Sequence, residues 1–173
     1  MEDVDFAAWY ESEHPRVLGV LCALSGELDV AREATDEAFV RAFARWGRVR
    51  KMASPGGWTY RVALNELRRS LRHRARERST PNEPPRAVPT TDPDLWDLVR
   101  RLPERQRLAV VLRYVADLPE QAIADVMGIT RSTAASTLTQ ARDRLGEWMQ
   151  AAEDDDDENN GRENNKDEEV DRA

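Results

Sequence analysis

Arginine side chains crowd one stretch near the middle of the chain, where an aromatic and an amide side chain accompany them. On a helix these residues share one face, with two of the arginines at its flanks. Guanidinium groups bind phosphates, amide groups bind base edges, and indole rings stack on unpaired bases. The residues that we expect to bind nucleic acid in this way are Trp58, Arg61, Asn65, Arg68, Arg69 and Arg72. The alternative is that Trp58 and Val62 belong to the core, which leaves only the distal arginines exposed.

A second polar group lies between residues 130 and 140, where small side chains and hydroxyl groups prevail. Apolar residues recur at intervals of four and three from Ala134 through Leu138, Ala141 and Leu145 to Trp148, so one stripe faces a core. The opposite face is small and polar, as in a helix that enters a DNA major groove. Its candidate DNA-binding residues are Thr130, Arg131, Ser132, Thr133, Ala135, Ser136, Thr137 and Gln140. Such a motif also occurs in helical bundles that bind no DNA.

Acidic and basic side chains are concentrated in different segments of the chain, which the net charge of −7 does not reveal. Residues 41–78 hold 12 basic and 2 acidic side chains, whereas residues 1–40 hold 2 basic and 10 acidic ones. Residues 153–173 carry a further 3 basic and 11 acidic side chains. Many basic groups in one segment repel each other unless a polyanion binds them, so the central segment predicts a nucleic-acid partner.

Residues that catalyse reactions or hold metal ions are sparse in this sequence. Cys22 is the single cysteine, which excludes an internal disulfide, and its apolar neighbours predict a buried thiol. The two histidines, His14 and His73, are far apart in the sequence, which argues against a zinc site. No nucleophile–base pair and no glycine-rich phosphate loop is visible. We therefore expect no catalytic residues, no metal, no cofactor and no enzymatic activity.

The second polar group is positioned by a predicted helix-turn-helix, formed by the last two of three helices within Leu102–Leu145. Pro103 and Pro119 stand where the first turn of a helix accepts proline. Gly128 follows a short apolar run and suits the left-handed turn that ends a helix. Thr130 is placed to cap the helix that follows.

The first 78 residues also predict helices, because their apolar residues recur with helical spacing. We expect one or two helices over Phe6–Leu24, with Pro15 as a start or a kink, and a turn at Ser25 and Gly26. The inner stripe of the next helix comprises Leu28, Ala31, Thr35, Ala38, Phe39, Ala42 and Trp46. Its outer face comprises Glu33, Asp36, Glu37 and Arg41, and Glu37 and Arg41 are spaced to pair along the helix.

The arginine-rich helix follows a predicted basic loop over Gly47–Gly57. Ser54 and Pro55 have the residue types that cap and begin a helix. The inner stripe of this helix comprises Tyr60, Leu64, Leu67 and Leu71.

These elements predict an all-α protein of two small helical domains, residues 1–78 and 93–150, joined by a proline-rich linker over residues 79–92. Such a linker spans about 40 Å when extended. Residues 151–173 form an acidic tail that we expect to be disordered. The chain has no signal peptide and no apolar run of transmembrane length, which predicts a cytoplasmic protein without membrane insertion.

Three segments, in this order, resemble sigma factors of bacterial RNA polymerase, in the extracytoplasmic-function group of the sigma-70 family. Ala31–Phe43, AREATDEAFVRAF, is similar to the family's AEDLVQETFLRAW, and Trp58–Asn65, WTYRVALN, is similar to its WL-x-R-I-A-x-N. Leu102–Leu145 resembles the family's C-terminal domain, with its LP-x-x-x-R start, its EIA-x-x-LG turn and its TVKSRLSRAR helix. The resemblance covers about residues 5–148.

The resemblance implies a subunit that binds core RNA polymerase and directs promoter-specific transcription initiation. The helix matching Glu33–Phe43 docks on the polymerase β′ clamp, which implies that Glu33, Asp36, Glu37, Phe39 and Val40 bind polymerase. The segment matching Gly47–Arg72 reads and melts the minus-ten element of promoter DNA. The segment matching Thr130–Arg144 reads the minus-thirty-five element. The resemblance also allows an anti-sigma factor as a further partner.

The sequence departs from the family pattern where basic groups usually meet DNA. Ala134, Ala135, Ser136 and Thr137 replace the family's Val-Lys-Ser-Arg, and Gln140 replaces a further arginine. These departures keep two alternatives open. The first is a helix-turn-helix regulator that acts without polymerase, and the second is a sigma-like module that binds polymerase but reads DNA weakly.

Overall fold

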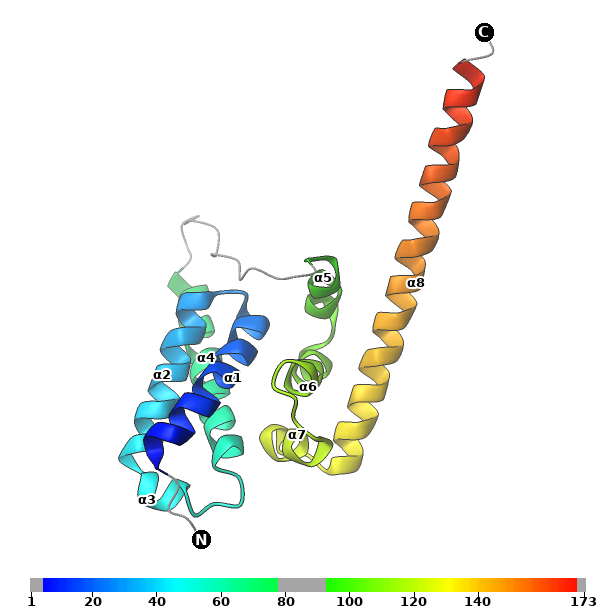
Figure 1. The fold of residues 1–173 in the computed structure, drawn as a ribbon. Helices are drawn as coiled ribbons and strands as arrows, with labels where there is room; N and C mark the ends of the chain where they lie inside the picture. Colours follow the sequence, from blue (N-terminus) through cyan, green and yellow to red (C-terminus); the bar gives the residue numbers. More distant parts are fainter. Residues whose placement is uncertain (1–4, 78–92, 171–173) are drawn as a thin grey trace.

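The computed structural model describes residues 5–77 and 93–170, with side chains described over residues 5–76 and 94–152. Within these ranges the regular structure consists of eight helices (Figure 1). They are α1 (Phe6–Ser25), α2 (Leu28–Ala44), α3 (Trp46–Val49), α4 (Pro55–Glu77), α5 (Pro93–Arg101), α6 (Glu104–Tyr114), α7 (Glu120–Met127) and α8 (Arg131–Val170). The predicted all-α fold is confirmed, and the predicted linker over residues 79–92 lies outside the described residues.

The N-terminal bundle consists of α1, α2 and α4, with the short α3 at one end (Figure 1). α1 is one continuous helix that contains Pro15, so the prediction of one or two helices resolves to one. It ends at Gly26, whose φ of 69° is a left-handed conformation that glycine adopts without strain. The buried core residues include Val17, Val20 and Leu21 from α1, Val30, Ala34, Ala38 and Phe39 from α2, and Tyr60, Ala63, Leu64 and Leu67 from α4.

The segment before α4 is partly helical, where the sequence predicted a loop. Val49 at the end of α3 is fully buried, and burial of this side chain holds the segment in a helical turn. The predicted start of α4 is confirmed, because the Ser54 hydroxyl accepts a hydrogen bond of 3.0 Å from the Gly57 amide and Pro55 is the first helical residue. The start of the arginine-rich helix is therefore fixed by its own cap.

The C-terminal domain contains the three predicted helices and one more, α5, which the sequence interpretation missed. Pro103 and Pro119 lie at the N-cap positions of α6 and α7, one residue before the first turn where we expected them. Gly128 ends α7 with a φ of 67°, as predicted. The predicted cap of α8 is also confirmed, because the Thr133 amide donates to the Thr130 hydroxyl at 3.2 Å.

The last helix is longer than predicted. We expected residues 151–173 to be disordered, but α8 continues to Val170 and projects away from the other helices (Figure 1). The capped and packed start of α8 already forms the first helical turns, which are the costly step of helix formation. Each further residue then adds one backbone hydrogen bond, and residues 131–170 contain no proline that would end the helix. None of the helices in the described ranges, α8 included, combines the length and the apolar composition of a membrane span.

The two domains pack against each other through α1 and α6 and through α4 and α7 (Figure 1). One apolar cluster runs through both of them, from Val17 and Leu64 to Leu108, Ile123 and Leu138. The sequence predicted the domains but not this contact between them.

Candidate functional site

The arginine-rich face of α4 is exposed in part and turned toward the C-terminal domain in part. Arg61, Asn65 and Arg68 have exposed side chains and line a groove that α6 and α7 complete with Glu104, Leu108, Val126 and Met127. Arg72 is also exposed and lines the adjoining groove beside α6. These four candidates line adjoining grooves on one side of α4, although the sequence placed Arg61 and Arg68 only at the flanks of the predicted face.

Two further candidates on α4 lie elsewhere. Arg69 is exposed and lines the opposite groove, which α2 completes, and its Nη1 lies 3.9 Å from a Glu66 carboxylate oxygen. Trp58 is half-buried and does not belong to the apolar clusters of the described residues. The interpretation of Trp58 as a core residue is therefore not supported, although the half-buried Val62 packs against the core.

An ion pair joins the arginine-rich face to the other domain. The Arg68 guanidinium contacts one Glu104 carboxylate oxygen through Nε and Nη2, each at 3.2 Å. The side chains are 44% and 69% exposed, so water and salt screen this pair. Arg68 thus holds a carboxylate where we expected a phosphate.

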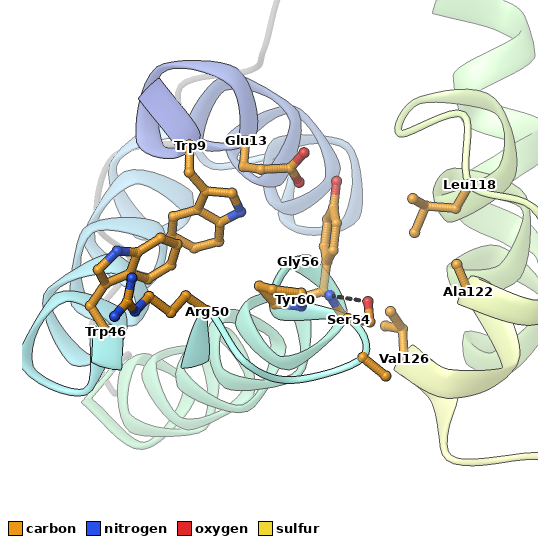
Figure 2. Close-up of a pocket in the computed structure, with 13 residues that line it drawn as sticks. Trp9, Glu13, Trp46, Arg50, Ser54, Gly56, Tyr60, Leu118, Ala122 and Val126 are labelled. Carbon is orange, nitrogen blue, oxygen red and sulfur yellow. Dashed lines mark hydrogen bonds between the residues drawn. The ribbon is translucent and has the colours of Figure 1, made fainter. Parts of the chain in front are cut away.

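A cavity of 360 Å³ lies where the start of α4 meets α1, α3 and α7. In Figure 2 the Tyr60 ring reaches toward the Glu13 carboxyl group, with Leu118, Ala122 and Val126 on the opposite wall. Tyr60 is 1% exposed, and its hydroxyl has no hydrogen-bond partner among the described residues. Burial raises the pKa of this phenol well above its ordinary value, and the nearby Glu13 charge raises it further.

Aromatic rings line the other side of this cavity. Trp9 and Trp46 lie with their ring centroids 4.7 Å apart, and Arg50 lies beside them (Figure 2). Phe6 joins the same cluster at 5.2 Å from the Trp46 ring centroid. The sequence placed Trp46 in an inner stripe but did not relate it to Trp9 or Phe6, since no local spacing relates α1 to α3.

The acidic outer face of α2 contains ordered ion pairs. Asp36 lies 2.9 Å from Nε2 of His14 on α1. Arg41 lies between two carboxylates, with Glu37 and Glu66 each at 2.8 Å. The Glu37 hydrogen bond is the main cause of a raised pKa of Arg41. Glu33 is exposed as predicted.

One predicted polymerase contact is corrected by burial. Phe39 is only 2% exposed and packs against the rings of Trp9, Tyr10 and His14, so it supports the surface from beneath and is not part of it. Val40 is 62% exposed, as expected, and Phe43 is 66% exposed although it was not among the predicted contacts. The spacing of Phe43, three residues after Val40, identifies it as a neighbour on the helix surface.

The start of α8 presents the predicted polar face. Ala134, Leu138 and Ala141 are buried, as the inner stripe predicted. The exposed candidates are Thr130, Arg131, Ser132, Thr133, Ser136 and Gln140, and the half-buried ones are Ala135 and Thr137. Arg131 is already paired, since its Nε lies 3.3 Å from a Glu120 carboxylate oxygen on α7.

Hydroxyl groups on this face use their protons within the helix. Ser136 and Thr137 both donate to the Thr133 carbonyl, at 3.0 and 2.7 Å. Their oxygens remain free to accept hydrogen bonds from base amino groups. Gln140 accepts a long hydrogen bond of 3.4 Å from Gln106 on α6. The face therefore offers mainly neutral acceptors, which bind less strongly than charged groups do.

Metal-binding groups do not converge in the described part of the chain, where no three His, Cys, Asp or Glu side chains form a cluster that could hold a metal ion. Cys22 is a buried free thiol, as predicted, and burial raises its pKa. Neither observation provides a site for a cofactor.

Two protein families match this chain. "Sigma-70 region 2" matches residues 9–77, and "Sigma-70, region 4" matches residues 93–145. The first therefore covers most of α1 and all of α2 to α4, and the second covers α5 to the start of α8.

Curated relatives match most of the chain at low identity. An uncharacterized protein of Rhizobium meliloti is 26% identical over 155 residues, which are 78% of this chain and 36% of that protein, so the chain spans about a third of this relative. The RNA polymerase sigma-H factor of Pseudomonas aeruginosa is 25% identical over 158 residues, which are 78% of this chain and 81% of that factor.

Solved structures share the fold. The sigma factor RpoE of Bartonella quintana, crystallised with the anti-sigma factor NepR, superposes with a TM-score of 0.68 at 21% identity and covers 84% of this chain and 97% of that one. CnrH, in complex with the cytosolic domain of CnrY, gives a TM-score of 0.60 at 15% identity over 84% of this chain and 88% of that one.

Proposed function

Because this chain belongs to the sigma-70 family, in its extracytoplasmic-function type, we propose that its two domains divide promoter recognition between them. The chain is a sigma factor, associated with RNA polymerase for promoter-specific initiation, and sigma factors are not enzymes. We place it in the cytoplasm, where bacterial RNA polymerase works on the chromosome. The observation that supports this division of promoter recognition is that the two polar faces lie on different helices, one on α4 and one on α8.

The arginine-rich face of α4 binds the minus-ten element in this proposal. Exposed Arg61, Arg68 and Arg72 are available to phosphates, and Asn65 lies among them to bind a base edge. Half-buried Trp58 at the start of the helix offers a ring for an unpaired base. Arg69 faces the groove beside α2 and takes no direct part.

The start of α8 reads the minus-thirty-five element in the major groove. Ser132, Ser136 and Gln140 contact base edges, and Arg131 contacts a phosphate or a guanine after it leaves Glu120. Because Arg131 is the one arginine among these contact residues and the others are neutral, this face binds weakly and depends on the rest of the complex for affinity.

The outer face of α2 binds the β′ clamp of core polymerase. Val40 and Phe43 form an exposed apolar centre, and Glu33, Asp36 and Glu37 surround it with negative charge. An apolar centre with a charged rim is the usual composition of a specific protein interface. The named complexes of the related structures support a further partner, an anti-sigma factor, for this chain as well.

The test is transcription by core polymerase with and without the chain, followed by sequencing of the transcripts. We expect discrete start sites only when the chain is present. Permanganate reactivity of unpaired thymines then measures melting of the minus-ten element. Arg61→Ala should slow melting about tenfold, because a lost charge-assisted contact costs about 1.5 kcal/mol.

Arg76→Ala is the matched control, since Arg76 is an exposed arginine at the far end of the same helix. Start sites that are the same without the chain would contradict the proposed function. Equal melting rates for the two variants would contradict the assignment of Arg61.

A further inference from the structure

The cavity between the start of α4 and α7 combines one carboxylate with aromatic and apolar walls. We propose that it is a binding site for a small aromatic cation, such as an arylamidine or an arylalkylamine. The described residues that line it include no member of the proposed DNA-binding faces or of the outer face of α2. The inference therefore goes beyond the proposed function and does not depend on it.

The cavity has the size and the composition of a small-molecule site. Its volume of 360 Å³ lies within the range of about 300–1,000 Å³ that is typical of ligand pockets. Such pockets are mostly apolar and contain a few polar groups that orient the ligand. Here Leu118, Ala122 and Val126 form an apolar wall, and Trp9 and Trp46 form an aromatic one (Figure 2).

Glu13 supplies the charge that selects a cation. Its side chain is 22% exposed, and its carboxylate accepts no hydrogen bond from the described residues. Among these residues it pairs with Arg16 at a distance of 3.8 Å, and the Arg16 side chain is 57% exposed. A carboxylate that is largely removed from water is stabilised by a ligand that brings both positive charge and N–H donors.

Gly56 allows this carboxylate to lie close to the start of α4. A Cβ atom at position 56 would lie 3.1 Å from Oε2 of Glu13, which is closer than ordinary packing allows. Tyr60, one turn further along α4, reaches toward the same carboxyl group (Figure 2). Its hydroxyl is buried without a hydrogen-bond partner among the described residues. This end of the cavity therefore presents the Glu13 carboxylate, with Tyr60 beside it.

The indole rings at the other end favour a flat aromatic body. Trp9 and Trp46 lie with their ring centroids 4.7 Å apart, so together they form one aromatic surface. Aromatic rings bind flat ligands by stacking and attract cations to their faces. Arg50 lies beside these rings, and its positive charge disfavours a second cation there (Figure 2). The charged group of the ligand therefore points toward Glu13, and its aromatic body lies against the indole rings.

The test uses the full-length chain and three probes of nearly the same shape. Benzamidine is a planar aromatic cation, benzamide is its neutral analogue and benzoate is its anionic analogue. The tyrosines are labelled with carbon-13, and NMR follows the signals of the three tyrosines during each titration. Tyr60→Phe identifies the Tyr60 signal, and the signal of the exposed Tyr114 is the internal control.

We expect benzamidine to shift the Tyr60 signal with a dissociation constant of about 1 mM, an ordinary affinity for so small a molecule. Benzamide and benzoate should bind at least about tenfold more weakly, because they lack the positive charge that pairs with Glu13. Glu13→Gln should remove this preference for benzamidine. Glu11→Gln removes the same charge from an exposed position on α1 and should leave the preference unchanged.

Ala122→Phe tests the location of the site from the opposite wall. Ala122 lines the cavity on α7, so a phenyl ring at this position takes the space of the probe. The folded variant, checked by thermal unfolding, should no longer bind benzamidine. Undiminished binding to folded Ala122→Phe would overturn the inference.

Three further outcomes would also overturn it, and they decide the question even if Ala122→Phe does not fold. The first is a Tyr60 signal that does not move at a benzamidine concentration about ten times the expected dissociation constant. The second is binding of benzamide or benzoate as tight as that of benzamidine. The third is an equal effect of Glu13→Gln and Glu11→Gln. Start-site selection is measured separately, so failure of the ligand site and failure of the proposed function are distinguishable.

Discussion

At the scale of single residues, Tyr60 is the buried group that most clearly lacks a partner. Its hydroxyl is buried without a hydrogen bond among the described residues, and its pKa is raised by burial. An unfolded tyrosine loses its proton at about pH 10, whereas folded Tyr60 keeps its proton above that pH. Above pH 10, unfolding therefore releases the Tyr60 proton. As a result the free energy of unfolding does not depend on this group below pH 10 and falls as the pH rises above it.

Tyr60→Phe should therefore raise the free energy of unfolding by about 1 kcal/mol at pH 7, since it removes an unsatisfied buried hydroxyl. It should also remove part of the loss of stability above pH 10, which amounts to about 1.4 kcal/mol per pH unit for one group. Urea unfolding between pH 7 and 11 measures both effects. Tyr114→Phe is the control because Tyr114 is 60% exposed, and an unchanged alkaline slope in Tyr60→Phe would contradict the argument.

The pairing of Arg131 with Glu120 gives a second prediction at this scale. The pair is exposed, so breaking it costs at most about 1 kcal/mol. Glu120→Gln releases Arg131 for DNA and should raise the affinity of the holoenzyme for promoter DNA up to about fivefold. Asp125→Asn removes the same charge from an exposed site on α7 and is the control in a filter-binding titration. An equal gain in both variants would attribute the effect to net charge alone.

At the scale of elements, α2 holds one buried and one exposed phenylalanine. Phe39 is buried among aromatic rings, whereas Phe43, one turn later, is exposed. Phe43 also contacts Phe6 with ring centroids 4.9 Å apart, and this contact fixes the orientation of its ring. A fixed and exposed aromatic ring is the kind of residue that dominates an interface.

Phe43→Ala should weaken binding to core polymerase about 30-fold, because a central aromatic residue contributes about 2 kcal/mol to an interface. Phe39→Ala should instead lower the free energy of unfolding by about 3 kcal/mol, since it opens a cavity in the core. Surface plasmon resonance against immobilised core polymerase and thermal unfolding distinguish the two effects. A Phe43→Ala chain that binds normally would remove α2 from the interface.

At the scale of the whole molecule, we expect the uneven distribution of charge to influence the affinity of the chain for DNA. Residues 41–78 carry a net charge of +10, and residues 153–173 carry −8. Residues 153–170 of this acidic segment continue the helix α8, whose start we propose to contact DNA. The acidic segment repels the phosphates of DNA. Because exposed charges act over about 10 Å at 0.1 M salt, we expect this repulsion to weaken DNA binding only at low ionic strength.

Deletion of residues 153–173 changes the net charge from −7 to +1. We expect the truncated chain to bind non-promoter DNA more tightly at 50 mM salt, and to match the full chain at about 0.5 M salt, where screening removes the difference. Fluorescence anisotropy over a salt series makes the comparison. Equal affinities at low salt would show that this segment does not affect DNA binding.

The sequence by itself determined the helices and their caps, because these depend on neighbours within one turn. Ser54, Gly128 and Thr130 act where their types predict, and most residues of the inner stripes of α2, α4 and α8 are buried, with half-buried residues at the ends of the stripes. The family also followed from three local motifs in order. In each of these cases, the types and spacing of nearby residues were sufficient for the prediction.

Only the tertiary structure decided which of these groups are free to bind. Arg68 pairs with Glu104, 36 residues away, and Tyr60 meets α7 across a cavity, and no local spacing encodes such contacts. Phe39 stood both in the predicted inner stripe and among the polymerase contacts that the resemblance implied, and its packing against rings of α1 decided for burial. The packing of α6 and α7 against α1 and α4 is of the same kind, because it depends on surfaces that meet only after both domains have folded.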